Sequence, residues 1–109
     1  MSKVLPRLPI HITFFSRSSC ALCTNARQNL ADAWKLRPFE FAEIDVMEPG
    51  QQKWKDVYEF DVPVIHVSKT GKGGVVEEVK KKLMHRFTPE EIVKAWDEVR
   101  EQGPVNEEK

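Results

Sequence analysis

The two cysteines of this 109-residue chain, Cys20 and Cys23, stand where one sequence pattern gives way to another. Before them, residues 10–15 (IHITFF) alternate in the way typical of a β-strand. After them, apolar residues recur at helical spacing: Leu22, Ala26, Leu30 and Ala33 or Trp34. The helix should end before Pro38, because a residue that precedes proline avoids the α conformation. A strand, a short polar loop and a helix are therefore expected, with both sulfurs at the start of the helix.

Two further strands and a short helix are predicted downstream. Residues 39–46 (FEFAEIDV) carry apolar side chains on both faces, as a strand covered on both sides does. Residues 48–60 favour a short helix with Pro49 near its start and with three inward side chains, Trp54, Val57 and Tyr58. Residues 61–68 (DVPVIHVS) predict a compact apolar strand.

The last third of the chain predicts a hairpin and a helix. The glycine-rich residues 69–74 predict the hairpin loop, and residues 75–79 predict its antiparallel return strand. Residues 88–103 predict a helix that is capped by Thr88, supported by a capping box with Glu91 and ended by Gly103. The order β-α-β-α-β-β-α predicts an α/β fold with one mixed four-stranded sheet and helices on both faces.

Length and composition predict one domain at residues 10–103, between an N-terminal arm at 1–9 and a disordered tail at 104–109. The net charge of +0 gives no reason to expect a nucleic-acid or membrane-surface partner, and no apolar run is long enough to span a bilayer. We expect a monomer in the cytosol. Mitochondria are the alternative, because Lys3 and Arg7 make the N-terminus basic.

The position of Cys20 predicts an activated thiol. An N-cap or first-turn residue lies beside unpaired backbone N–H groups and the positive end of the helix dipole, which favour an anion. Arg17 adds a positive charge three residues earlier. Such surroundings lower a cysteine pKa from about 8.5 to roughly 3.5–7.5. Cys23, one turn later, should be more buried, so we expect Cys20 to attack a disulfide and Cys23 to displace the product.

Two other readings of the cysteines are open at this point. They can be apolar core residues, which suits Cys23 better than Cys20 in its polar loop. They can also be half of a zinc site completed by histidines, although a second C-x-x-C is absent. We expect no metal ligands, because C-x-x-C at a strand-to-helix junction within a βαβ pattern favours redox chemistry.

Pro63 opens the strand at 61–68. Proline lacks a ladder donor and belongs at a strand start or edge, which is one reading of Val62-Pro63. The other is a cis proline that exposes the Val62 backbone N–H and C=O beside the cysteines, where they can pair with a bound peptide.

With FFSRSSCALC at the first β–α junction and DVPVIHV downstream, the chain resembles glutaredoxin-like members of the thioredoxin superfamily, in particular a small family of fungi and animals. The resemblance covers about residues 9–102. It implies that Cys20 is the nucleophile and Cys23 the resolving thiol. It further implies that Arg17 matches the family's basic residue, and that Val62-Pro63 clamps glutathione or a substrate.

The chain departs from the glutaredoxin pattern at three places, one of which is the lengthened region around the last strand, with GKGG and VKKKL. The other two lie at the expected site. The usual C-P-Y-C is Cys20-Ala21-Leu22-Cys23, and the Gly-Gly…Asp segment that holds the γ-glutamyl group is replaced by MHRFTPEE. Free N–H groups at the start of the last helix, near Thr88, would take a carboxylate instead, with help from Arg86.

These observations favour a C-x-x-C thiol–disulfide oxidoreductase with glutathione as co-substrate and no tightly bound cofactor. Its partners would be glutathione or protein disulfides. One alternative is a [2Fe–2S] carrier in which Cys20 and glutathione are the ligands. Another is a redox-inactive binding module of the same fold.

Overall fold

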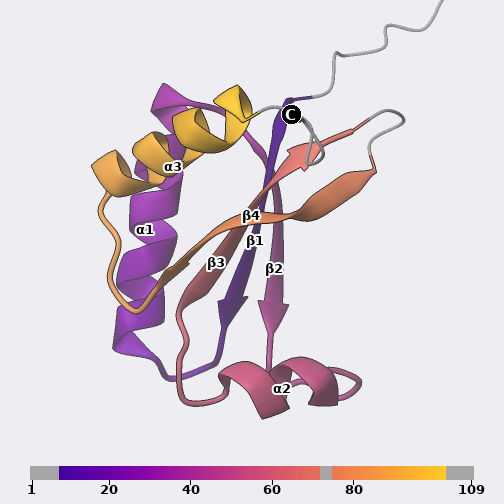
Figure 1. Cartoon of the computed structure of the whole chain (residues 1–109). Coiled ribbons are helices and arrows are strands. Elements are labelled where there is room, and N and C mark those ends of the chain that lie inside the picture. Colours follow the sequence, from indigo (N-terminus) through magenta and orange to yellow (C-terminus); the bar gives the residue numbers. More distant parts are fainter. Residues whose placement is uncertain (1–7, 72–74, 103–109) are drawn as a thin grey trace, which may run out of the picture.

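The computed structural model describes residues 8–71 and 75–102 and contains four strands and three helices (Figure 1). In chain order they are β1 (Ile10–Ser16), α1 (Ala21–Leu36), β2 (Glu40–Asp45), α2 (Gln52–Tyr58), β3 (Val64–Thr70), β4 (Val76–Met84) and α3 (Pro89–Glu101). The predicted order of elements is confirmed. Most of the predicted arm, the whole predicted tail and Gly103 lie outside the described residues.

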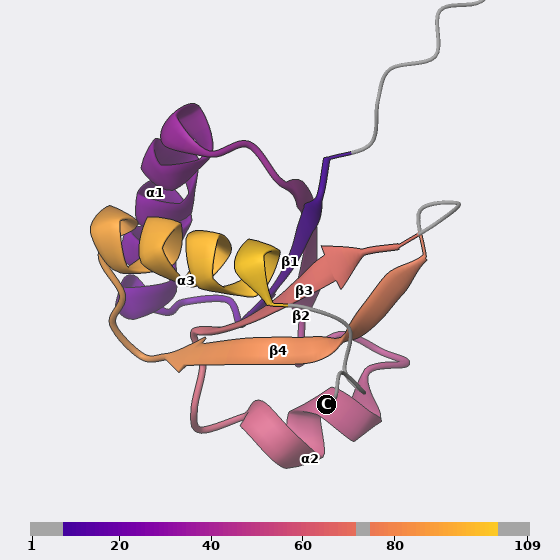
Figure 2. The same ribbon diagram turned by 45° about the horizontal axis from the view of Figure 1, so that its top comes forward.

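The four strands form one mixed sheet in the order β2-β1-β3-β4. β1 is parallel to β2, with His11 opposite Glu40, and antiparallel to β3, with Phe15 opposite Val64. β4 pairs antiparallel to β3 as the second arm of the hairpin, as Figure 2 shows. This register brings the end of β1 and the start of β3 to the same end of the sheet, where α1 begins.

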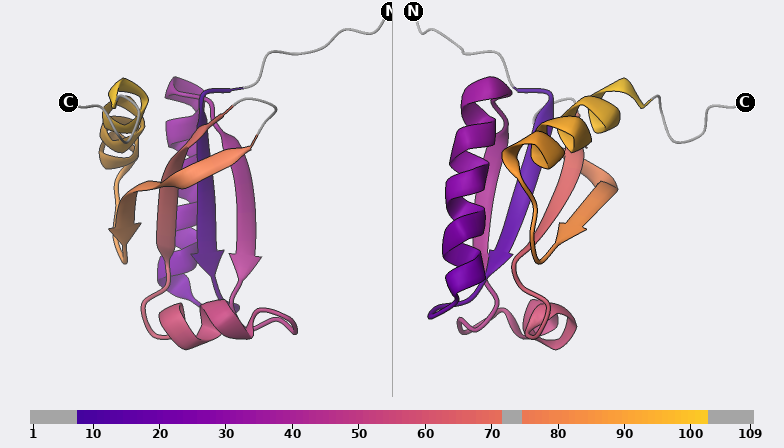
Figure 3. Two further views of the ribbon diagram at one scale, coloured as in Figure 1. Left: turned by 45° about the vertical axis from the view of Figure 1, so that its right-hand side comes forward. Right: turned by 90° about the vertical axis from the view of Figure 1, so that its left-hand side faces the viewer.

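Helices cover both faces of the sheet. Neighbouring residues of β1 point to opposite faces, so each face can be followed from one of them. Phe14 faces α1, where the Arg27 guanidinium lies 5.5 Å from its ring centroid. Phe15 faces α2, and its ring centroid is 4.6 Å from that of Trp54. Figure 3 shows α1 running along the sheet and α2 lying across its lower end. The predicted fold class is therefore confirmed.

Three predictions about α2 and β2 are wrong. α2 begins at Gln52 rather than near Pro49, because turns occupy the preceding residues. Val57 is 53% exposed instead of inward, because α2 is short and only part of it rests on the sheet. β2 is an edge strand and leaves Phe41 exposed, so it is not covered on both sides along its length.

The capping of α3 agrees with the prediction. The Thr88 hydroxyl accepts the Glu91 N–H at 3.1 Å, and the Thr88 N–H donates to the Glu91 carboxylate at 2.9 Å. β4 continues to Met84, beyond the predicted residue 79, and includes Lys80, Lys81 and Lys82. In the described part of the chain, no helix has the length and apolar character that crossing a membrane requires.

Candidate functional site

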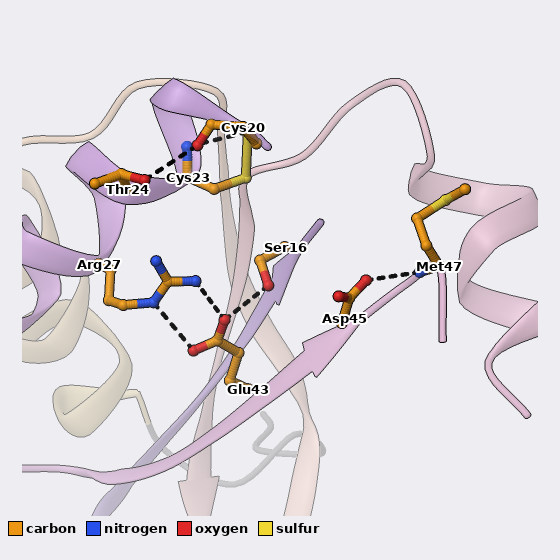
Figure 4. Close-up of polar contacts among 8 residues, drawn as sticks. All are labelled: Ser16, Cys20, Cys23, Thr24, Arg27, Glu43, Asp45 and Met47. Carbon is orange, nitrogen blue, oxygen red and sulfur yellow. Dashed lines mark hydrogen bonds and ion pairs between the residues drawn. A yellow bond between two sulfur atoms is a disulfide. The ribbon is translucent and has the colours of Figure 1, made fainter. Parts of the chain in front are cut away.

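Cys20 and Cys23 form a disulfide at the first turn of α1 (Figure 4). Cys20 is the N-cap residue, and its sulfur accepts the backbone N–H of Cys23 at 3.1 Å. The Cys20 carbonyl accepts the Thr24 N–H, which starts the helix. The predicted place of Cys20 at the N-cap is confirmed, with its sulfur in the position where a capping oxygen normally lies.

The two sulfurs have different surroundings. Cys23 is 1% exposed and belongs to the core, whereas Cys20 is only partly buried. The first turn of α1 contains no acidic side chain, so no negative charge offsets the positive end of the helix. An incoming reagent therefore reaches Cys20 before Cys23.

Arg17 lies in the loop before Cys20, and its side chain connects this loop to α2. Its Nη1 donates to the backbone carbonyl of Glu59, the C-cap residue of α2, at 3.1 Å. The guanidinium thus holds the β1–α1 loop against the α2–β3 loop. That its charge also acts on the Cys20 sulfur stays a prediction.

The Val62–Pro63 peptide bond is cis, as one reading of the sequence proposed. The expectation that the Val62 N–H is free to pair with a bound peptide is wrong. It donates to the Tyr58 carbonyl at 3.1 Å, because the chain leaves α2 in a tight turn that also bonds the Asp61 N–H to the same oxygen. The Pro63 carbonyl accepts the His85 N–H at 2.7 Å.

A polar network that the sequence reasoning missed lies on the strand side of the disulfide (Figure 4). Arg27, one turn after Cys23, donates to the Glu43 carboxylate from Nη2 at 2.6 Å and from Nε at 3.3 Å. The buried Ser16 hydroxyl donates to the same carboxylate at 2.8 Å. These hydrogen bonds, the Arg27 bond above all, lower the pKa of Glu43. The network ties α1 to the ends of β1 and β2.

A polar cleft of about 410 Å³ lies between α1 and the start of α3, and Leu22 of the C-x-x-C turn is one of its lining residues. Leu22 and Asn25 of α1 line one wall, and His85, Arg86 and Thr88 line the other. The structure thus brings Arg86 and Thr88, both predicted site residues, to a cleft beside the C-x-x-C helix. Arg17 and Val62 lie by the α2–β3 loop and do not line this cleft.

The expectation of free N–H groups near Thr88 is wrong for Thr88 and Glu91 themselves. The capping box uses the N–H groups of Thr88 and Glu91, and Pro89 has none. Two acidic side chains, Glu90 and Glu91, also lie in this first turn. Arg86 is therefore the arginine that lines the cleft, and the two acidic side chains disfavour an anion at the helix end itself.

Sequence comparison decides the family. A family model described as a glutaredoxin-like domain (DUF836) matches residues 11–96. The chain belongs to this glutaredoxin-like family. Within the described residues of this glutaredoxin-like domain, no group of three or more metal-ligating side chains occurs.

Several solved thioredoxins have the same fold. A mutant thioredoxin from Halobacterium salinarum NRC-1 is 16% identical, with a TM-score of 0.67, and the match covers 89% of this chain and 80% of that one. Thioredoxin-2 of a malaria parasite is 11% identical, with a TM-score of 0.66 and 88% coverage of both chains. Oxidized thioredoxin O2 from Arabidopsis thaliana is 15% identical, with a TM-score of 0.61, and the match covers 85% of this chain and 76% of that one. These likenesses show the fold.

The family, the fold and the Cys20–Cys23 pair together indicate a thiol redox function at a general level. The site can supply one partly buried sulfur at a helix N-cap and one fully buried sulfur bonded to it. That arrangement suits the formation and exchange of a disulfide.

Proposed function

We propose that this glutaredoxin-like domain is a thiol–disulfide oxidoreductase that uses glutathione as its co-substrate. One observation carries the proposal: the Cys20 sulfur occupies the N-cap of a 16-residue helix and accepts a backbone N–H there. A thiolate at this position gains a charge-assisted hydrogen bond and the favourable helix dipole, so Cys20 is the attacking group.

The exchange proceeds in two balanced steps. The Cys20 thiolate attacks a substrate disulfide, a Cys20–substrate disulfide forms, and the other substrate sulfur leaves as a thiolate. The Cys23 thiolate then attacks the Cys20 sulfur, which restores the internal disulfide and releases the second substrate thiol. Two glutathione molecules reduce the internal disulfide again and leave as oxidised glutathione.

The cleft between α1 and the start of α3 supports glutathione as the co-substrate. It is polar, it adjoins the C-x-x-C turn, and Arg86 supplies a cation for a glutathione carboxylate. We assign the wall on the other side of the disulfide to Val62 and Pro63, and the flanking positive charge to Arg17. Thr88 helps to shape the cleft rather than to bind an anion, since its N–H and hydroxyl are occupied by Glu91.

The test is disulfide exchange with glutathione by single-cysteine variants. We expect Cys20→Ser to abolish exchange, and Cys23→Ser to accumulate a mixed disulfide with glutathione that mass spectrometry detects. Arg86→Gln should raise the glutathione concentration needed for half-maximal rate, and Lys94→Gln, an exposed change on α3, should not. Exchange retained by Cys20→Ser would overturn the role of Cys20. A rate independent of glutathione in the wild type would overturn the choice of co-substrate.

A further inference from the structure

Phe60 is the most exposed large apolar side chain among the residues that the structure describes, with 87% of its surface accessible. It lies in the loop between α2 and β3, directly after the C-cap residue Glu59. Val57, one turn earlier, is also more than half exposed. Neither side chain contributes to the buried core, so the folded domain gains little stability from them.

The backbone on both sides of Phe60 is held in place. The Glu59 N–H donates to the Lys55 carbonyl, and the Glu59 carbonyl accepts the Arg17 guanidinium. On the other side, the N–H groups of Asp61 and Val62 both donate to the Tyr58 carbonyl. The ring is therefore presented from an anchored turn, which lowers the entropy cost of using it in an interface.

This turn lies beside the loop that leads to the attacking sulfur. Arg17, three residues before Cys20, bonds directly to the residue that precedes Phe60. The pairing of Phe15 with Val64 fixes both loops at the same end of the sheet. Figures 1 and 2 both show the α2–β3 loop next to the β1–α1 loop. The apolar rim of Phe60 and Val57 is separate from the polar cleft at Arg86, because neither residue lines that cleft.

We propose that Phe60 is a specificity residue that selects protein disulfides with an apolar side chain next to the reacting cysteine. This inference rests on the proposed function. The chemistry at Cys20 determines what contacts Phe60, because a polypeptide that bonds to Cys20 through its own cysteine brings the flanking residues to the neighbouring α2–β3 loop. A backbone clamp at the Val62 N–H is not available, since Tyr58 occupies that group. Besides the Val62 carbonyl, the α2 side then recognises a polypeptide through side-chain contact.

Each turnover consists of two thiol–disulfide exchanges. The Cys20 thiolate breaks the substrate disulfide and forms a bond to the peptide cysteine, and the small leaving thiol departs as a thiolate. Cys23 then releases the peptide as a thiol and closes the Cys20–Cys23 disulfide. Pre-reduced protein supplies both electrons, so a single-turnover assay needs no further reductant.

The experiment compares two peptides that carry the same mixed disulfide with 2-mercaptoethanol and differ only in the residue after cysteine, leucine or serine. We expect the wild type to react about tenfold faster with the leucine peptide, and Phe60→Ser to lose this preference. Phe60→Leu should retain it, because the rim stays apolar. The control Leu36→Ser removes another exposed apolar side chain, at the far end of α1, and should leave the preference unchanged.

Hydroxyethyl disulfide, which has no flanking residues, separates the two proposals. All four proteins should reduce it at one rate, because it makes no contact with the rim. Equal wild-type rates for the two peptides, or an unchanged preference in Phe60→Ser, would overturn the role of Phe60 and leave the oxidoreductase intact. Failure of the wild type on every disulfide, hydroxyethyl disulfide included, would overturn the proposed function itself.

Discussion

The substitution Tyr58→Phe should destabilise the domain by leaving one buried nitrogen unpaired. The Tyr58 hydroxyl and His66 Nε2 share a hydrogen bond of 2.6 Å, and both residues are buried. Phenylalanine keeps the ring and its contacts with Trp54 and Phe15, so the change removes only the hydroxyl. A buried polar group without a partner costs about 1–3 kcal/mol. We expect a loss of about 1.5 kcal/mol in the free energy of unfolding, which lowers Tm by about 6–12 °C.

The assay is urea unfolding followed by tryptophan fluorescence and far-UV circular dichroism, with the C-x-x-C pair kept oxidised throughout. A double-mutant cycle with His66→Leu isolates the pair. The loss of stability in the double variant should be about 1 kcal/mol smaller than the sum of the two single losses, because neither partner is left unpaired. A Tyr58→Phe protein as stable as the wild type, or strictly additive effects, would refute the reasoning.

Three further substitutions test the buried histidine, the Arg27–Glu43 ion pair and the cap of α3. Burial, and then the charge of Lys82, lowers the pKa of His66 below its ordinary 6.5. The contribution of neutral His66 to the free energy of unfolding is therefore present above pH 6.5 and is lost as the pH falls through the folded-state pKa. The His66→Leu variant should show a smaller fall of Tm in acid. Glu43→Gln should cost less than about 1 kcal/mol at neutral pH, since its partner Arg27 is half-exposed. That difference should vanish in acid, because the pKa of Glu43 is lowered and its ion-pair stability is lost as the pH falls. Thr88→Ala should cost about 1 kcal/mol in chemical unfolding, whereas a serine there should cost far less.

Local features of this chain were predictable from the sequence. The N-cap position of Cys20 and the capping box at Thr88 follow from residues within one helical turn, and both are confirmed. The order of strands and helices follows from hydrophobic period and turn residues, and it determines the sheet through the handedness and crossover rules.

Features that depend on residues distant in sequence were not predictable. The Arg27–Glu43 pair joins residues 16 positions apart, and neither side chain stands out in its local pattern. The exposure of Val57 and Phe41 depends on where α2 ends on the sheet and on which strand forms the edge. One local feature was also missed: the bond from the Val62 N–H to the Tyr58 carbonyl, four residues earlier, depends on the exact geometry of a turn, which the sequence pattern does not define.

The most direct test of the central claim is the pH dependence of Cys20 alkylation by iodoacetamide in the Cys23→Ser variant. The backbone N–H of residue 23 remains in this variant, so the Cys20 sulfur keeps its hydrogen bond. The account predicts an apparent pKa well below the value of about 8.5 for an ordinary thiol, because the helix N-cap stabilises the thiolate. An apparent pKa at or above that value would contradict the claim that this helix start activates Cys20.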